Sequence, residues 1–232
     1  MARNLVTIGF DADDTLWHNE RFFKDTQARF ADLLADHTDR AGLDARLEAA
    51  ERRNIGHYGF GVKGFTLSMI ETAIEVTDGQ VPASVISELL AAGREMLAHP
   101  VELLPHAREA VEAVAGTHHL VLITKGDLLH QERKLAQSGL GELFDAVEIV
   151  SDKDRRTYAR IFDRSPGGPA AAMMVGNSMK SDVIPAIEAG GWGVFVPHDL
   201  AWSLEHAEPP EHPRYHTLPD LGALPALVEA LE

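Results

Sequence analysis

Short apolar runs and longer amphipathic stretches alternate along the chain from about residue 105 onward. Runs of strand length lie at 119–124, 146–150, 171–175 and 194–196. Stretches with helical periodicity lie between them, at 127–138, 154–164 and 181–189. This alternation is typical of βα units, whose strands pair in parallel. With the apolar run Leu5–Phe10 as a further strand, it predicts an α/β fold with a doubly wound, mainly parallel sheet.

A region with helical periodicity alone separates Leu5–Phe10 from the other expected strands. Its apolar residues recur at helical spacing over 22–34, 43–53, 65–76 and 81–97, and no strand pattern appears there. We therefore expect an inserted all-helical domain at 19–99, and an α/β core built from 1–18 and 100–232.

Proline and glycine residues mark several expected boundaries. Pro105 suits the first turn of a helix, and Gly139 and Gly190 stand where helices are expected to end. The Pro-Gly-Gly-Pro segment at 166–169 predicts a surface turn before the next strand. The stretch 205–213, rich in Pro, Glu and His, is expected to be an irregular loop.

Composition and charge narrow the class of protein. The 232 residues are 45% hydrophobic and 25% charged, as in ordinary globular proteins. There is no cysteine, which excludes disulfides, zinc–thiolate sites and thiol nucleophiles. The net charge of −15 argues against a nucleic-acid partner, because such surfaces cluster Lys and Arg against phosphates.

Hydropathy gives an expectation about location. No apolar stretch approaches the roughly 20 residues that span a bilayer, and the apolar run after residue 4 is too brief for a signal peptide. We expect a cytoplasmic protein with no membrane partner. Its oligomeric state is left open.

A cluster of carboxylates follows the first expected strand. Asp11, Asp13 and Asp14 lie within the segment Asp-Ala-Asp-Asp-Thr, directly after Phe10. Bringing such like charges together in a buried place is costly without a cation. A divalent metal ion bridging the carboxylates, with a phosphate bound to the metal, would remove that cost. Asp14 is expected to bond nearby amides in the turn rather than to act in catalysis.

Three other strand ends also carry polar residues suited to phosphate chemistry. In open parallel sheets ligands bind outside the carboxyl ends of the strands, so these residues are expected to converge. They are Thr124, Lys125, Gly126 and Asp127 after the second strand in the chain, Ser151, Asp152 and Lys153 after the third, and Gly176, Asn177 and Ser178 with Asp182 after the fourth.

With these motifs in this order, the chain resembles the haloacid dehalogenase (HAD) superfamily. It is most similar to the phosphatase-like members, which have a Rossmann-like core and a helical cap inserted after the first core strand. The resemblance covers nearly the whole chain. The Asp-x-Asp-x-Thr motif matches the segment that starts at Asp11, the second-motif hydroxyl matches Thr124, the third-motif lysine matches Lys153, and the acidic fourth motif matches Gly176 to Asp182.

The resemblance implies a role for each matched residue. Asp11 would be the nucleophile and Asp13 the acid/base. Thr124 and Lys153 would hold the phosphoryl oxygens. Asp182 would bind Mg²⁺ together with Asp11 and the Asp13 main-chain carbonyl. The implied activity is Mg²⁺-dependent hydrolysis of a small phosphorylated metabolite through an aspartyl-phosphate intermediate.

The residue types fit this chemistry on general grounds. A carboxylate nucleophile splits one difficult displacement into two easier ones. The main-chain amides of Lys125 and Gly126 are candidates to bind a phosphoryl oxygen of the substrate. Asp13 must give a proton and later take one, and we expect neighbouring carboxylates to raise its pKa enough for both tasks.

One position departs from the commonest family pattern. Many relatives have Asp after the glycine of the fourth motif, where this chain has Asn177. An amide oxygen can bind Mg²⁺ directly or hold one of its waters. We therefore expect weaker metal affinity rather than loss of activity, with Asn177 as a candidate metal ligand.

The inserted region contains a glycine-rich segment at 59–64. It matches the dinucleotide fingerprint only in letters, because the residues before it read as a helix and not as a strand. Either it is a plain helix-to-helix loop, or His57, Tyr58 or Lys63 reaches the substrate. Lys63 is the candidate substrate-binding residue from this segment.

Three other functions compete with the phosphatase. A phosphomutase would use the same scaffold and pass the phosphoryl group to a sugar hydroxyl. A dehalogenase is disfavoured, since such relatives do not require the Asp13 acid or the metal ligands. A non-catalytic phosphate-binding regulatory protein would keep the pocket without turnover.

Overall fold

Strand β1 (Thr7–Phe10) is a central strand of a six-stranded parallel sheet with the order β3-β2-β1-β4-β5-β6. The chain is described by a computed structural model over residues 5–200 and 202–232. In register, Ile8 pairs with Leu120 on one side and Met173 on the other. The other strands are β2 (His119–Lys125), β3 (Ala146–Val150), β4 (Ala172–Gly176), β5 (Trp192–Phe195) and β6 (Tyr215–Thr217).

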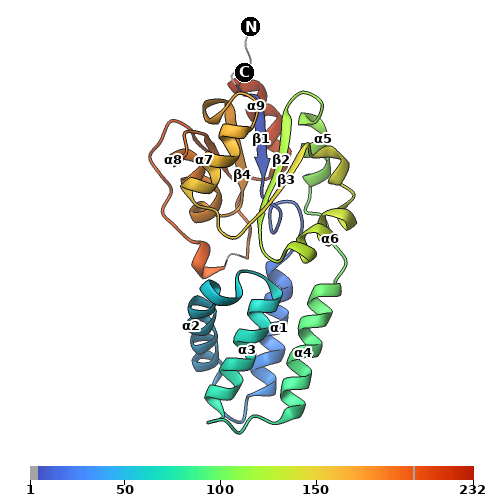
Figure 1. The fold of residues 1–232 in the computed structure, drawn as a ribbon, viewed down its shortest axis with the longest axis vertical. Helices are drawn as coiled ribbons and strands as arrows, with labels where there is room; N and C mark the ends of the chain where they lie inside the picture. The colour runs from blue at the N-terminus through green and yellow to red at the C-terminus, as the bar shows by residue number, and fades with distance from the viewer. Residues whose placement is uncertain (1–4, 201) are drawn as a thin grey trace. The chain divides into compact units, whose positions relative to one another are not determined.

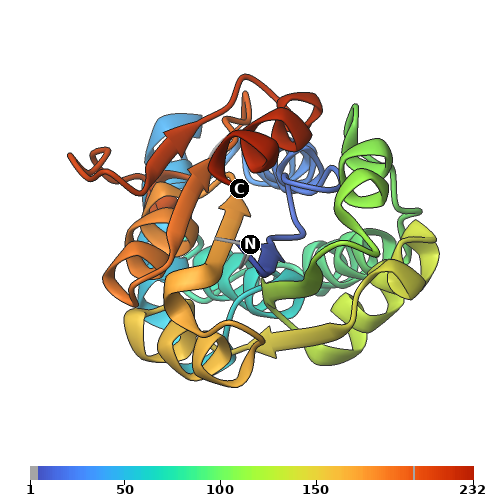
Figure 2. The ribbon, with the colours of Figure 1, turned by 90° about the horizontal axis from the view of Figure 1, so that it is seen from above.

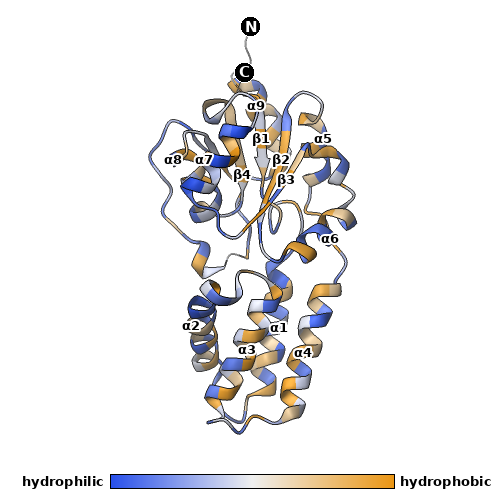
Figure 3. Cartoon of the chain, viewed as in Figure 1, coloured by the Kyte–Doolittle hydropathy of each residue, from blue (hydrophilic) through white to orange (hydrophobic). Residues whose placement is uncertain are grey.

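Side chains alternate between the two faces of this sheet, and each face has its own apolar core. Along β2, Leu120 and Leu122 pack into one core, whereas Val121 and Ile123 pack into the other. This is the period of two expected for a strand. Helices cover both faces, and the central strands β1 and β4 are buried along their whole length (Figures 2 and 3).

The first core contains residues of α5 (Ala107–Val114), α6 (Leu128–Ser138) and α9 (Leu224–Leu231). The second contains residues of α7 (Arg155–Arg164) and α8 (Ile184–Glu188). The predicted doubly wound α/β class is therefore confirmed, with helices packed on both faces of one parallel sheet (Figure 1).

Four helices share a separate apolar core. They place Phe30, Leu47, Met69 and Leu89, one residue from each helix, at 1% exposure or less. These four helices are α1 (Glu20–Leu33), α2 (Arg40–Tyr58), α3 (Val62–Val76) and α4 (Ala83–Ala98).

No helix of the described residues is both long and apolar enough to cross a bilayer.

The chain divides into two compact units along these lines. The helical unit comprises Arg21–Pro100 and Gly126–His130, and the α/β unit comprises the rest. These limits differ by one or two residues from the expected 19–99, and the short segment after β2 joins the helical unit instead of the core.

The structure departs from the sequence-based fold prediction in three details. The expected loop at 205–213 is irregular apart from the end of a 3₁₀ turn at Glu205, but the sixth strand that follows it was not predicted, because it is only three residues long and lacks an apolar run. Pro105 lies in the turn before α5 instead of its first helical turn. The helix expected at 181–189 is short, because Met179–Val183 form a π-helical turn before α8.

Candidate active site

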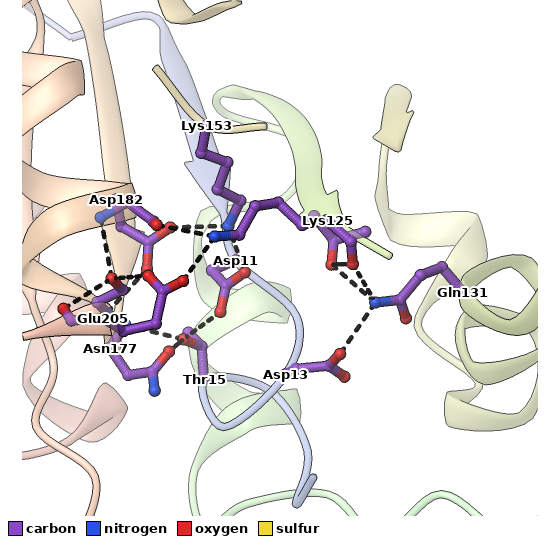
Figure 4. A network of polar contacts seen from close by, with 12 residues as sticks. Asp11, Asp13, Thr15, Lys125, Gln131, Lys153, Asn177, Asp182 and Glu205 are labelled. Carbon is purple, nitrogen blue, oxygen red and sulfur yellow. Dashed lines mark hydrogen bonds and ion pairs between the residues drawn. The ribbon is translucent and has the colours of Figure 1, made fainter. Parts of the chain in front are cut away.

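The carboxyl ends of four neighbouring strands bring the predicted site residues together (Figure 4). Asp11 follows β1, and Thr124 lies near the end of β2. Lys153 follows β3, and Asp182 lies in the π-helical turn after β4. These four residues are at most 6% exposed, so the sheet edge forms a largely buried polar cluster.

Asp11 has a separate partner for each carboxylate oxygen. Thr15 donates its hydroxyl to Oδ2 at 3.0 Å, and Lys153 donates its ammonium to Oδ1. Burial, together with the charges of Asp182 and Asp13, outweighs Lys153 and raises the pKa of Asp11 to about 7. The nucleophile candidate is oriented but needs more positive charge to be fully ionised at neutral pH.

Lys153 also binds Asp182, the acid of the fourth motif. Its Nζ donates to Asp182 Oδ1 at 2.7 Å, while the Ser178 amide donates to Oδ2 at 2.9 Å. Burial alone would lower the pKa of Lys153, but Asp11 and Asp182 outweigh it and raise the pKa. Lys153 is therefore an ammonium ion at neutral pH, shared between two carboxylates.

Gly176 explains how Asp182 comes so close to the strand end. A Cβ atom at position 176 would lie 2.3 Å from Asp182 Oδ2, well inside contact distance. The π-helical turn then brings the Asp182 amide to the Ser178 carbonyl at 2.9 Å. Such turns are frequent at functional sites because they redirect side chains within a helix.

Asn177 faces two of the groups that the family resemblance assigns to a metal ion, Asp11 and the Asp13 carbonyl, together with the Thr15 hydroxyl. With its side-chain nitrogen toward them, it donates to Asp11 Oδ2, Thr15 Oγ1 and the Asp13 carbonyl, each at 3.2 Å. These three oxygens can therefore surround a positively charged or hydrogen-bond-donating group.

The donor set fits Mg²⁺, which prefers oxygen ligands. Asp11, Asp182, the Asp13 carbonyl and a rotated Asn177 amide would hold it, and its charge would offset the excess of carboxylates over ammonium. No cluster of three or more His, Cys, Asp or Glu suited to a metal ion occurs among the described residues. The fit therefore depends on main-chain and amide oxygens as much as on carboxylates.

Asp13 lies in a second polar cluster, which it forms with Trp17 and with two residues of α6. Lys134 Nζ contacts its two oxygens at 2.5 and 2.7 Å, and Gln131 and Trp17 donate to it at 2.9 and 2.7 Å. Burial would raise the pKa of Asp13, but Lys134 and these hydrogen bonds outweigh it and lower the pKa. The expectation that neighbouring carboxylates raise this pKa is therefore wrong, because Lys134 is the nearer charge.

Thr124 belongs to the same network. Its hydroxyl accepts a hydrogen bond from Gln131 at 3.1 Å and donates to the Lys125 carbonyl at 3.3 Å. Gln131 thus connects the second-motif hydroxyl with the acid/base candidate Asp13.

Asp14 has the turn-stabilising contacts expected of it. Its carboxylate accepts the main-chain amides of Asn19 at 2.8 Å and Glu20 at 2.9 Å, at the start of α1. Its φ of 60° is the left-handed conformation that Asp tolerates better than most residues. Asp14 therefore fixes the exit from the site loop into the first helix.

Lys63 and Gly126 both belong to the helical unit. Lys63 Nζ pairs with Asp127 at 2.7 Å, and its side chain is 54% exposed. A substrate contact by Lys63, or by the Lys125 and Gly126 amides, remains a prediction.

A further cluster surrounds Glu205. Its carboxylate contacts Lys125 Nζ at 2.6 Å and the Ser178 hydroxyl at 2.5 Å, and Lys125 also donates to Ser181 at 2.9 Å. The segment that carries Glu205 is held by Lys180, which donates to the Leu204 carbonyl at 2.8 Å.

Sequence reasoning missed several residues of this site. Gln131 and Lys134 lie on the buried face of α6 with Leu135, and two polar residues on an apolar face were an available signal. Tyr158, whose hydroxyl donates to the Ser181 carbonyl at 3.0 Å, resembles any core aromatic in sequence. No local sequence pattern predicts the place of Glu205, because its partners Lys125 and Ser178 are 80 and 27 positions away in the chain.

The comparisons with known proteins agree with this geometry. A scan against protein families matches residues 5–190 to the haloacid dehalogenase-like hydrolases. A haloacid dehalogenase-like family hydrolase of known structure from Xanthomonas campestris is 43% identical, with a TM-score of 0.90 over 99% of this chain and 93% of that one.

More distant structures share the fold. YfnB from Bacillus subtilis, solved with magnesium, is 17% identical with a TM-score of 0.66, covering 97% of this chain and 99% of that one. L-2-haloacid dehalogenase from Xanthobacter autotrophicus is 19% identical with a TM-score of 0.69, covering 98% and 100%. No curated protein sequence matches the chain. The chain thus belongs to the haloacid dehalogenase-like hydrolase family.

Proposed function

We propose that this hydrolase is a Mg²⁺-dependent phosphatase that acts on a small phosphorylated metabolite through an aspartyl phosphate. The observation that carries the proposal is the separation of two carboxylates with different partners. Asp11 is held by Thr15 and Lys153 as a nucleophile, whereas Asp13 is held by Lys134 as a separate proton carrier.

The first step forms a bond between an Asp11 oxygen and phosphorus and breaks the ester bond to the leaving alkoxide. Lys153 and the Thr124 hydroxyl hold the phosphoryl oxygens. Bound Mg²⁺ supplies charge that allows the anionic nucleophile to approach an anionic phosphate. Asp13 gives its proton to the leaving oxygen.

In the second step, water attacks phosphorus and Asp13 takes its proton, which releases phosphate and restores the Asp11 carboxylate. The ionised Asp13 of this structure suits this step. For the first step Asp13 needs a proton, and movement away from Lys134 and Gln131 removes the contacts that keep its pKa low.

A dehalogenase is the second candidate, since L-2-haloacid dehalogenase shares the fold and Asn177 replaces a metal-binding acid. The test compares an aryl phosphate with an L-2-haloacid, each with Mg²⁺ and with chelator, and uses Asp11→Asn as the inactive control. We expect Mg²⁺-dependent phosphate release and no halide. Halide release in chelator would favour the dehalogenase.

A phosphomutase can be distinguished from a phosphatase by the products that each forms. With sugar monophosphates, the phosphatase releases free phosphate, whereas a mutase yields the isomeric sugar phosphate. If the protein hydrolyses none of a broad panel of phosphate esters in the presence of Mg²⁺, this result would favour the hypothesis of a non-catalytic phosphate-binding regulatory protein.

A further inference from the structure

The carboxylate of Glu205 lies among polar side chains next to the proposed phosphoryl site (Figure 4). We call this place, formed by Lys125, Ser178 and Ser181, the anion site. One carboxylate oxygen contacts Lys125 Nζ at 2.6 Å, and the other accepts the Ser178 hydroxyl at 2.5 Å. The Ser181 hydroxyl accepts from the same ammonium at 2.9 Å. One cation and two hydroxyls thus surround a single carboxylate.

The site is built for negative charge. Side chains of Lys125 and Glu205 are only 13% and 19% exposed. Burial would raise the pKa of Glu205, but Lys125 and the two serine hydroxyls outweigh it and lower the pKa to about 2. The Glu205 carboxylate is therefore ionised at neutral pH.

The anion site is joined directly to the residues that handle the phosphoryl group. Lys125 follows Thr124 on β2, and Ser181 precedes Asp182. Ser178 contributes to both places, because its hydroxyl binds Glu205 while its amide binds Asp182. A group bound there would belong to the same small substrate.

Glu205 itself has no role in the proposed chemistry. It comes from a short 3₁₀ turn, Ser203–Glu205, in the connection between β5 and β6. Its neighbours Ser203 and His206 are exposed, so the turn lies at the surface.

We propose that Lys125, Ser178 and Ser181 form a subsite for a carboxylate group of the substrate, which Glu205 fills until the substrate displaces it. The inference rests on the proposed phosphatase function and narrows its substrate to phosphate monoesters that carry a carboxylate. The oxygens of Glu205 already occupy Lys125 Nζ and the Ser178 hydroxyl, so a substrate carboxylate can take over these contacts only if Glu205 leaves. A second carboxylate beside Glu205 would also be repelled by its charge.

The test uses pairs of substrates that differ only in the second group. Phosphate monoesters with a carboxylate one, two or three carbons away are compared with the corresponding alcohol monophosphates. Wild type, Glu205→Ala and Lys125→Met are assayed, with Glu208→Ala as the matched control because Glu208 is an exposed acid on the same connection. Thermal unfolding checks that each variant is folded.

Wild type should prefer one of the carboxylate esters over its alcohol partner. In Glu205→Ala, the ratio of kcat/KM for the carboxylate ester to that for the alcohol ester should rise about tenfold or more, since one charged contact no longer has to be displaced. In Lys125→Met the preference should disappear, and Glu208→Ala should keep the wild-type ratio. An equal loss with both esters in Glu205→Ala would overturn the subsite and make Glu205 a positioning residue for Lys125.

Binding provides a readout that does not need turnover. In Asp11→Asn, calorimetry measures the affinity for the same ester pairs, with and without the added Glu205→Ala change. Tighter binding of the carboxylate ester in the double variant supports the subsite even if no ester is hydrolysed, which would count against the phosphatase alone. Equal affinities for both esters would refute the subsite while leaving the phosphatase untouched.

Discussion

At the scale of single residues, the site is a balance of charges around Asp11. One ammonium, that of Lys153, serves two buried carboxylates. Burial raises the pKa of Asp11 to about 7, because this shared ammonium does not offset it. A bound divalent cation would lower that pKa and ionise the nucleophile. The same imbalance gives Lys153 and Asn177 distinct, testable roles.

Replacing Lys153 removes the shared positive charge. Lys153→Ala should lower kcat by at least about 100-fold, because charge stabilisation at the transferring group is lost. Steady-state assays with an aryl phosphate measure this, and Lys24→Ala is the control because Lys24 is an exposed lysine of α1, in the helical unit. Near-normal rates would mean that another cation, such as Lys125, holds the phosphoryl group.

Asn177 should limit metal affinity. Asn177→Asp adds a charged oxygen ligand, so the Mg²⁺ concentration for half-maximal activity should fall about tenfold, since ligand charge sets affinity at such sites. Asn177→Ala should raise it, and excess chelator should silence all three proteins until Mg²⁺ is restored. Activity that survives chelator would refute the metal assignment.

The sequence reveals some of these residues and not others. Asp11, Thr124, Lys153 and Asp182 are predictable because each stands at the end of a recognisable strand or in the loop that follows it. The partner of Asp13 is not, because Lys134 is 121 positions away and its ion pair reverses the expected pKa shift. Charge partners that are distant in sequence are set by packing rather than by local pattern.

At the scale of elements, strand ends and the turns that follow them place the site. Strands β2, β3 and β4 are predictable within one or two residues because apolar runs and turn residues agree. Strand β6 has only three residues and no apolar run, and the π-helical turn at 179–183 has no known sequence signature here. The place of the Asp182 side chain depends on the absence of a side chain at Gly176.

A side chain at position 176 should displace Asp182. In Gly176→Ala the new Cβ would lie 2.3 Å from Asp182 Oδ2, so the carboxylate must leave the Ser178 amide or Lys153. Mg²⁺ activation should weaken and kcat should fall about tenfold or more, as expected when a positioned group shifts by about 1 Å. Gly56→Ala is the control, since nothing lies within 4 Å of a Cβ there. Wild-type Mg²⁺ dependence in Gly176→Ala would contradict this account.

Asp14 should contribute to stability through the start of α1. Asp14→Ala removes the acceptor for the Asn19 and Glu20 amides and puts alanine at a φ of 60°, so the free energy of unfolding should fall by about 1–2 kcal/mol. Asp14→Asn keeps an acceptor and tolerates this φ, and should lose less. Denaturant unfolding measures both, and equal losses would show that the Asp14 acceptor does not stabilise the start of α1.

At the scale of the whole molecule, the chain is acidic, with a net charge of −15. Among the described residues, Lys134 and Lys153 are buried lysines, and each forms an ion pair with an aspartate of the first motif. These two buried ammonium groups thus lie among the aspartates of the candidate site and offset part of their negative charge. The sequence predicts the fold class and the two-part organisation, whereas this local charge pattern appears only once the sheet is assembled.

The Glu205 ion pair makes stability depend on pH. Its folded pKa of about 2 lies below its usual value of 4.5, so its ionised form stabilises the fold above pH 4.5, and this contribution is lost as the pH falls toward 2. The difference in unfolding free energy between wild type and Glu205→Gln should be on the order of 2 kcal/mol at pH 6 and should shrink by pH 3. Glu208→Gln should show no such trend, and a difference that is constant with pH would contradict the pairing.

The most direct test of the central claim is to identify the atom that carries phosphorus during turnover. Enzyme working on a phosphate ester with Mg²⁺ is quenched rapidly in acid, and its peptides are analysed by mass spectrometry. The account predicts one added phosphoryl group on Asp11, absent from Asp11→Asn. A phosphoryl group on another side chain, or none during demonstrated phosphate release, would contradict it.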